Sequence, residues 1–380
     1  MIYCDDFYCL NIKTLKERGI DAIDISNPND TTFIQNVVSG DYLLIDMHRY
    51  DSIIELLNGS LNITFVLFLN QESTNPGKRK SILDSAPPNY KIYFSTAHLD
   101  LETHNNDLSF TTRLRTFTNL FKSKFYDINY LSNLIDKKRA KKYNMFNRAP
   151  NLRRLKAFEL IKKRSIKLED CYYTFGFVLL KNVFSGINNL LEYFEHTNNQ
   201  RRNMNDGLEF DWDLILSSQN EFKTYEDREL MRNDDRSVGI DNTYEIINNH
   251  SLDSYISFVI ESSNDTCNDL RITEKTVRPL LLKNIFLSIG CNSFANCLNK
   301  LGIETFEEVF GLEQGWDNNC SETEKIAKFV DALEYINNLS KEEIEKIYFS
   351  DNIQRKLNNN HKIVMEAFNN EAVVIDELKM

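Results

Sequence analysis

The fold is decided by residues 255–290, which read YISFVIESSNDTCNDLRITEKTVRPLLLKNIFLSIG. Residues 255–261 form an apolar run that ends in Glu261, and residues 285–289 form a second apolar run of strand length. Between them, residues 274–283 have the spacing of an amphipathic helix. The order strand, helix, strand predicts a pair of parallel strands joined by a crossover. Strands that are apolar along their whole length are typical of a sheet that is covered on both faces.

The same alternation of strands and helices extends through most of the chain. We expect further strands at residues 1–10, 21–26, 42–47, 63–69, 91–95, 143–146 and 171–180. A basic run at residues 137–142 separates the two series of strands. We therefore predict an α/β protein with two Rossmann-like lobes, residues 1–136 and 143–320. A helical tail, residues 321–380, is expected to pack back on the lobes.

The composition limits the kinds of partner that this protein can have. The 45 Lys and Arg residues against 56 Asp and Glu residues leave a net charge of −11, so a broad face for nucleic-acid phosphates is not expected. No run approaches the roughly 18 apolar residues of a membrane span. Residues 1–6, MIYCDD, lack the basic and apolar regions of a signal peptide. The seven Cys residues contain no CxxC pair, so we expect reduced thiols in a cytoplasmic protein.

The sequence contains no motif for a metal or for a glycine-rich phosphate loop. Its six His residues form neither an i, i+4 pair nor a cluster with carboxylates at metal-ligand spacing. With 12 Gly residues in 380, the chain has no GxGxxG and no GxxxxGK[ST]. We therefore expect no metal and no resident cofactor. A bound nucleotide would have to be held by side chains and by a helix N-terminus.

The helix expected at residues 274–283 opens with a candidate anion site. Thr273 is a natural N-cap, so the free N–H groups of the helix start and Lys275 would face the carboxyl edge of the sheet. Open α/β sheets bind their ligands at that edge. A diphosphate would meet these N–H groups and Lys275, while Glu261 or Glu274 would accept ribose hydroxyls. A capped surface helix with an exposed Glu–Lys pair is the alternative interpretation.

A second group of cations lies in residues 147–154, which read NRAPNLRR. Arg148, Arg153 and Arg154 flank the start of the helix expected at residues 152–163, and guanidinium groups there suit a diphosphate. A helix with a solvated basic face is the alternative. The run at residues 137–142, KKRAKK, is likewise either a solvated linker or a patch that faces an anionic substrate.

These motifs resemble two known families. Glu261-Ser262-Ser263, then ITEKTVRP at residues 272–279, then an apolar run that ends in Gly290, looks like the donor-binding segment of α1,3-fucosyltransferases. Residues 147–154, 272–279 and 298–306 (LNKLGIETF) resemble still more closely a family of tailed-phage proteins. Arg278 stands where that family usually has Lys, and Arg153 where it usually has His.

The resemblance, which covers residues 143–306, implies a metal-independent GT-B-type glycosyltransferase that a bacteriophage encodes and that acts in the host cytoplasm. The nucleotide-sugar donor, a co-substrate, would bind the lobe 143–320, and the acceptor would bind the lobe 1–136. The donor-binding residues would be Arg148, Arg154, Glu261, Ser262, Thr273, Glu274 and Lys275. The transferase also needs a general base at the end of a strand in the first lobe. We assign Asp46 and His48 to this catalytic role, with His98 and Asp100 as alternatives.

The acceptor stays open between a hydroxymethylated base in phage DNA, a glycan, a protein and a small molecule. DNA modification would require a basic track, for which the chain offers residues 137–142, Arg148, Arg153, Arg154 and the pair at 201–202. The alternative function is a non-catalytic phage protein that binds a nucleotide or a host factor on a degenerate fold of the same kind. A virion or host-takeover interaction protein is a third.

Overall fold

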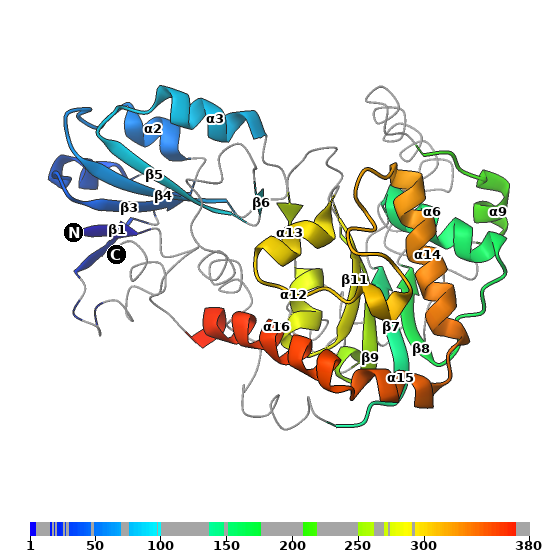
Figure 1. Ribbon diagram of the computed structural model, residues 1–380. Coiled ribbons are helices and arrows are strands. Elements are labelled where there is room, and N and C mark those ends of the chain that lie inside the picture. Colours follow the sequence, from blue (N-terminus) through cyan, green and yellow to red (C-terminus); the bar gives the residue numbers. More distant parts are fainter. Residues whose placement is uncertain are drawn as a thin grey trace. The chain divides into compact units, whose positions relative to one another are not determined.

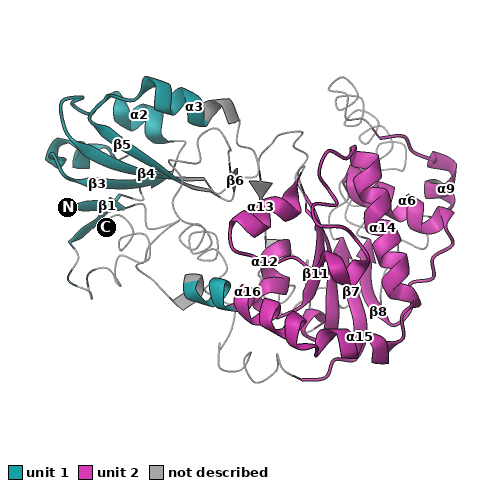
Figure 2. Cartoon of the chain, viewed as in Figure 1, with its two compact units in different colours: residues 1–125, 268–271, 362–380 teal, residues 126–267, 272–361 magenta. Residues whose placement is uncertain are grey.

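The chain folds into two α/β units (Figure 2). The structure is a computed structural model that describes residues 1–4, 16, 19, 21–25, 27, 30–46, 49–69, 76–96, 98–99, 137–147, 151–175, 208–218, 250–261, 270–272, 274–290 and 293–369. Unit 1 comprises residues 1–125, 268–271 and 362–380, and unit 2 comprises residues 126–267 and 272–361. The chain after residue 320 is thus shared between the two units. Each unit contains its own parallel sheet, which confirms the predicted α/β class.

Unit 1 is built on a five-stranded parallel sheet in the order β2-β1-β3-β4-β5 (Figure 1). Its strands are β1 Ile2–Cys4, β2 Ala22–Asp24, β3 Tyr42–Asp46, β4 Ile63–Leu69 and β5 Tyr90–Thr96. The described connections include the 3-10 helix η1 Thr32–Asn36 and the helices α2 Tyr50–Ile54 and α3 Pro76–Ser85. Two short strands, β6 His98–Leu99 and β10 Leu270–Arg271, pair antiparallel. Because β1 has β2 on one side and β3 on the other, the winding of the sheet reverses between β1 and β3.

The core of unit 1 has the side chains that a doubly covered sheet requires. Leu43, Leu44 and Ile45 are consecutive in β3 and all fully buried, so both faces of this strand are covered. Tyr50 of α2 packs edge-on against Phe65 of β4, with ring centroids 5.3 Å apart. Such aromatic pairs fasten a helix to the sheet with more geometric specificity than aliphatic contacts.

Unit 2 is built on a four-stranded sheet, β8-β7-β9-β11, in which every neighbouring pair is parallel. The strands are β7 Lys141–Asn147, β8 Cys171–Phe175, β9 Ser254–Ile260 and β11 Ile285–Ile289. All residues of β9 and β11 are buried, as their apolar sequences predict. The winding reverses between β7 and β9, since the chain runs from β7 out to β8 and returns to the other side of β7.

Helices cover both faces of this second sheet (Figure 1). The helices are α6 Leu152–Lys163, α9 Trp212–Ser217, α12 Glu274–Leu281 and α13 Phe294–Lys300, with the 3-10 helix η5 Glu307–Phe310. Figure 1 shows α12 and α13 on one side of the sheet and α6 with α14 (Glu322–Asn338) on the other. On the α14 side, Phe258 of β9 packs edge-on against Phe329, with centroids 5.4 Å apart.

The C-terminal helices begin where the sequence supplies caps. Ser321 opens α14, and Ser340 opens α15 Lys341–Tyr348, each with a complete capping box. In the tail expected to be helical, residues 321–380, α15 is followed by α16 Asp351–Asn369. Between them, the Ser350 hydroxyl donates to the Ile347 carbonyl at 2.7 Å, and Ser350 in turn accepts the N–H of Gln354.

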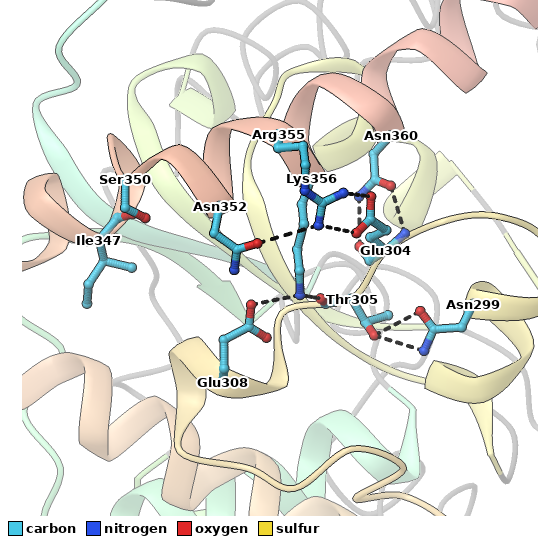
Figure 3. Close-up of polar contacts among 10 residues, drawn as sticks. All are labelled: Asn299, Glu304, Thr305, Glu308, Ile347, Ser350, Asn352, Arg355, Lys356 and Asn360. Carbon is cyan, nitrogen blue, oxygen red and sulfur yellow. Dashed lines mark hydrogen bonds and ion pairs between the residues drawn. The ribbon is translucent and has the colours of Figure 1, made fainter.

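Helix α16 is anchored to the segment that follows α13 (Figure 3). The two Nη atoms of Arg355 each lie 2.7 Å from an oxygen of Glu304, and the Lys356 ammonium lies 2.7 Å from Glu308. Asn360 accepts the N–H of Glu304 and donates to its carbonyl, both at 2.8 Å. Asn360 is 1% exposed, so this amide satisfies a buried stretch of main chain.

Candidate functional site

The carboxyl edge of the sheet in unit 2 is the place where a ligand is expected, because ligands of open α/β sheets bind where the winding reverses. β7 ends there at Asn147 and β9 at Ile260. Asn144 pairs with Ser257 across the two strands, so the parallel register places Asn147 level with Ile260. The segments that begin α6 and α12 follow these two strand ends.

Glu261 fastens the first turn of α12 to the end of β9. Its backbone N–H donates to the Ile289 carbonyl of β11 at 3.0 Å, which extends the pairing of the strands by one residue. The Thr276 hydroxyl donates to Oε1 of Glu261 at 2.6 Å, and both side chains are fully buried. A buried carboxylate held by a hydroxyl is a rigid support for the helix start. The role of Glu261 as an acceptor for ribose hydroxyls stays a prediction.

Lys275 lies in the first turn of α12, beside this support, and its side chain is half-buried. Glu274 is the first residue of α12, and its side chain lies outside the described residues, as do Ser262 and Thr273 as a whole. The N-terminus of a helix favours anions, and a Lys in the first turn adds a charge at the same place. The arrangement therefore fits the predicted anion site, with Thr276 as the residue that sequence reasoning missed.

Arg154 holds the start of α6 against the end of β9. Its Nη2 donates to the Ile260 carbonyl at 2.7 Å, and it is 1% exposed. Asn151 caps the helix by accepting the N–H of Arg154 at 2.9 Å, and its amide donates to the Glu261 carbonyl at 3.4 Å. The Arg154 guanidinium thus contacts the main chain of β9, and its donor-binding role stays a prediction. Arg148 lies outside the described residues.

Arg153 belongs to a buried group of charges, which excludes a solvated basic face for this part of α6. Its guanidinium forms an ion pair with Glu322, whose other oxygen lies 2.8 Å from the Lys325 ammonium. These three side chains are at most 5% exposed. Asp317 lies near Lys325, and burial raises the pKa of its carboxyl group while the N–H of Ala295 and Lys325 oppose the shift. The group links α6 to the N-terminus of α14.

Two residues of the basic run at residues 137–142 differ from both of its interpretations, while Lys137 and Lys138 are exposed. Arg139 is 2% exposed and donates to the carbonyls of Ser254 and Leu282, at 2.5 and 2.9 Å. Lys142 is buried and donates to the Asn337 carbonyl at 2.7 Å. These two cations satisfy main-chain carbonyls inside unit 2, so they are neither a solvated linker nor a patch for a substrate.

The predicted catalytic base is placed only through the backbone of unit 1. Asp46 is the last residue of β3, and β3 is one of the two strands between which the winding of that sheet reverses. The position is the one expected for a functional side chain on an open α/β sheet. The side chain of Asp46 and the whole of His48 lie outside the described residues.

Asn147 is a further residue of the candidate site that sequence reasoning did not select. It ends β7 and is 1% exposed, and within the described part of the chain neither polar atom of its side-chain amide has a hydrogen-bond partner. Its backbone N–H is satisfied by the Thr174 hydroxyl at 3.0 Å. The available signal was its place as the first residue of the NRAPNLRR motif, directly before Arg148.

The chain was compared with protein-family models, curated proteins and solved structures. No protein-family model, no curated protein and no solved structure matches the chain. Within the part of the chain that the structure describes, no group of three or more His, Cys, Asp and Glu side chains could hold a metal ion. None of the helices described is long and apolar enough to cross a membrane.

Proposed function

We propose that the protein is a metal-independent glycosyltransferase of the two-lobe GT-B type, which moves a sugar from a nucleotide-sugar donor to an acceptor hydroxyl. The observation that carries the proposal is the carboxyl edge of the sheet in unit 2. There the start of α12, with Lys275 in its first turn, is fixed to β9 by the buried Glu261–Thr276 hydrogen bond. A diphosphate is the ligand that such a helix start and Lys suit best.

The reaction requires stabilisation of a leaving group, which the same residues can supply. When the bond between the sugar and the diphosphate breaks, negative charge develops on the diphosphate. Lys275 and the free N–H groups at the start of α12 would neutralise this charge, with Arg148 as a second cation. Because Glu261 and Arg154 hold the surrounding main chain, the donors would need little rearrangement during the reaction.

The acceptor hydroxyl loses a proton when it attacks the sugar. We assign this proton to a general base, either Asp46, the last residue of β3, or His48. The products are the glycosylated acceptor, the nucleoside diphosphate and a protonated base. No metal enters the scheme.

The burial of several cations argues against DNA as the acceptor more than against a glycan, a protein or a small molecule. Arg139, Lys142, Arg153 and Arg154, all of which a basic track would use, are at most 6% exposed. Buried guanidinium and ammonium groups that bind main chain or carboxylates cannot release counterions from DNA phosphates. A hydroxymethylated base in phage DNA therefore stays an acceptor to be tested beside a glycan, a protein and a small molecule.

A panel of nucleotide sugars tests the proposal directly. The purified chain is incubated with UDP-, GDP-, ADP- and CMP-linked sugars, with and without EDTA, and release of the nucleotide is measured. Slow release from at least one donor, unchanged by EDTA, is the expected result. Binding without release would favour the non-catalytic nucleotide-binding alternative. Release that EDTA abolishes and added metal restores would remove the protein from the metal-independent class.

A further inference from the structure

Strand β7 carries two buried Asn residues in contrasting surroundings. Asn144 is 3% exposed, and its Nδ2 donates to the Ser257 hydroxyl of β9 at 3.0 Å. Asn147, three residues later, is 1% exposed, and neither its Nδ2 nor its Oδ1 has a hydrogen-bond partner among the residues that the structure describes. Most buried side-chain amides in folded proteins are hydrogen-bonded, so the second Asn requires an explanation.

A purely structural role does not explain the amide of Asn147. The backbone N–H of this residue already has its partner in Thr174, and that bond does not depend on the side chain. An apolar side chain of similar size would avoid the cost of an unsatisfied amide at the same position. Without a ligand, the buried amide therefore lowers the stability of unit 2. Groups that cost stability in this way are concentrated at functional sites.

The position of Asn147 identifies the ligand group that it would meet. The residue ends β7 level with Ile260 of β9, at the reversal of the winding, and neighbouring strands lie about 4.8 Å apart. The start of α12 follows β9, so a diphosphate there would lie about one strand away from Asn147. The groups attached directly to the diphosphate of a nucleotide sugar are the ribose and the transferred sugar.

We propose that Asn147 binds a sugar hydroxyl of the donor, an inference that rests on the proposed function. A hydroxyl is both a donor and an acceptor, and it can satisfy Oδ1 and Nδ2 of one amide together. A phosphate oxygen only accepts hydrogen bonds, so it would leave Oδ1 without a donor. The phosphates are better suited to the cationic start of α12. Asn147 is thus the residue of this edge that recognises the neutral part of the donor.

The experiment compares Asn147→Leu with Asn144→Leu in the full chain, since the two residues lie in one strand. Thermal unfolding and isothermal titration with UDP, GDP, ADP, CMP and their sugar conjugates are measured for each variant. We expect Asn147→Leu to keep or raise the midpoint of unfolding and to bind the nucleotide sugar at least about tenfold more weakly. We expect Asn144→Leu, which breaks the bond to Ser257, to lower the midpoint and to keep the affinity.

The outcomes separate this inference from the proposed function. Equal losses for the nucleotide and its sugar conjugate identify the ribose, and a loss confined to the conjugate identifies the transferred sugar; both support the inference. Unchanged affinity in Asn147→Leu, with a wild-type protein that binds, overturns the inference and leaves the function standing. A wild-type protein that binds no member of the panel overturns both. If Asn147→Leu does not fold, Asn147→Ala is titrated in the same way, and undiminished affinity again overturns the inference.

Discussion

Replacing Glu322 with Gln, which keeps the shape of the side chain and removes its charge, should strongly destabilise unit 2. Glu322 lies between two buried cations, with Arg153 on one carboxylate oxygen and Lys325 at 2.8 Å from the other. The side chains of Arg153, Glu322 and Lys325 are 3%, 5% and 3% exposed. The substitution keeps the size of the side chain and removes the charge that both cations share.

The expected loss follows from what remains after the substitution. Two buried cations then face a neutral amide in place of the carboxylate that both contact. Removing one partner of a buried ion pair costs about 3–5 kcal/mol, because the other charge stays buried without compensation. We therefore expect the free energy of unfolding of Glu322→Gln to be lower by about 3 kcal/mol or more at neutral pH.

Urea denaturation followed by tryptophan fluorescence measures this loss in the correct unit. Both tryptophans of the chain, Trp212 and Trp316, lie in unit 2. Glu324→Gln is the matched control, since Glu324 lies in the same turn of α14 and binds the exposed cap of Ser321, which Gln also satisfies. The control should stay within about 0.5 kcal/mol of the wild type. A Glu322→Gln variant as stable as this control would refute the reasoning.

Two further predictions concern the same unit. Burial alone would raise the pKa of Glu322, but Arg153 and Lys325 outweigh this effect and lower the pKa. The stability that the carboxylate contributes is therefore fully present above its unfolded pKa of about 4.3. It is lost as the pH falls through the lower pKa of the folded state. Unfolding followed from pH 6 to pH 3 should thus show a steeper loss for the wild type than for Glu322→Gln, and parallel curves would contradict this. Arg139→Met should lower the free energy of unfolding by about 3 kcal/mol. It removes the Arg139 hydrogen bond to the buried Leu282 carbonyl and leaves the Ser254 carbonyl with only its bond from Asn284. The exposed neighbour Lys138, whose side chain is 78% exposed in its pair with Glu345, should lose less than about 1 kcal/mol when changed to Met, and similar losses for both variants would be evidence against the buried role of Arg139.

Local sequence signals predicted the elements of this fold well. The apolar runs at residues 63–69 and 285–289 coincide with β4 and β11, and residues 152–163 coincide with α6. These signals depend on residues within one element: continuous burial in a strand, or a cap such as Asn151 at a helix start. The start of β7 was misplaced, since Lys141 and Lys142 were interpreted as part of a basic linker.

The contacts of the basic residues could not be predicted, because their partners are distant in the sequence. Lys142 donates to the Asn337 carbonyl, 195 positions later in the sequence, and Arg153 pairs with Glu322, 169 positions later. The local sequence shows only consecutive cationic residues, and such residues are ordinarily expected on a solvated surface. The Glu261–Thr276 bond spans only 15 positions inside one strand–loop–helix stretch. The sequence analysis selected Glu261, but as an acceptor for ribose hydroxyls and without Thr276.

The affinity of the candidate site for nucleoside diphosphates tests the central claim most directly. Isothermal titration of the diphosphates UDP, GDP and ADP, and of the monophosphate CMP, is carried out in the presence of EDTA. The proteins are the wild type, Lys275→Ala and Lys300→Ala, whose Lys is the exposed last residue of the neighbouring helix α13. We predict that at least one nucleotide binds the wild type and that Lys275→Ala binds it more weakly by about 1.5–3 kcal/mol, the scale of a charge-assisted hydrogen bond. Lys300→Ala should bind as the wild type does. No binding by any nucleotide, or unchanged affinity in a folded Lys275→Ala variant, would contradict the account.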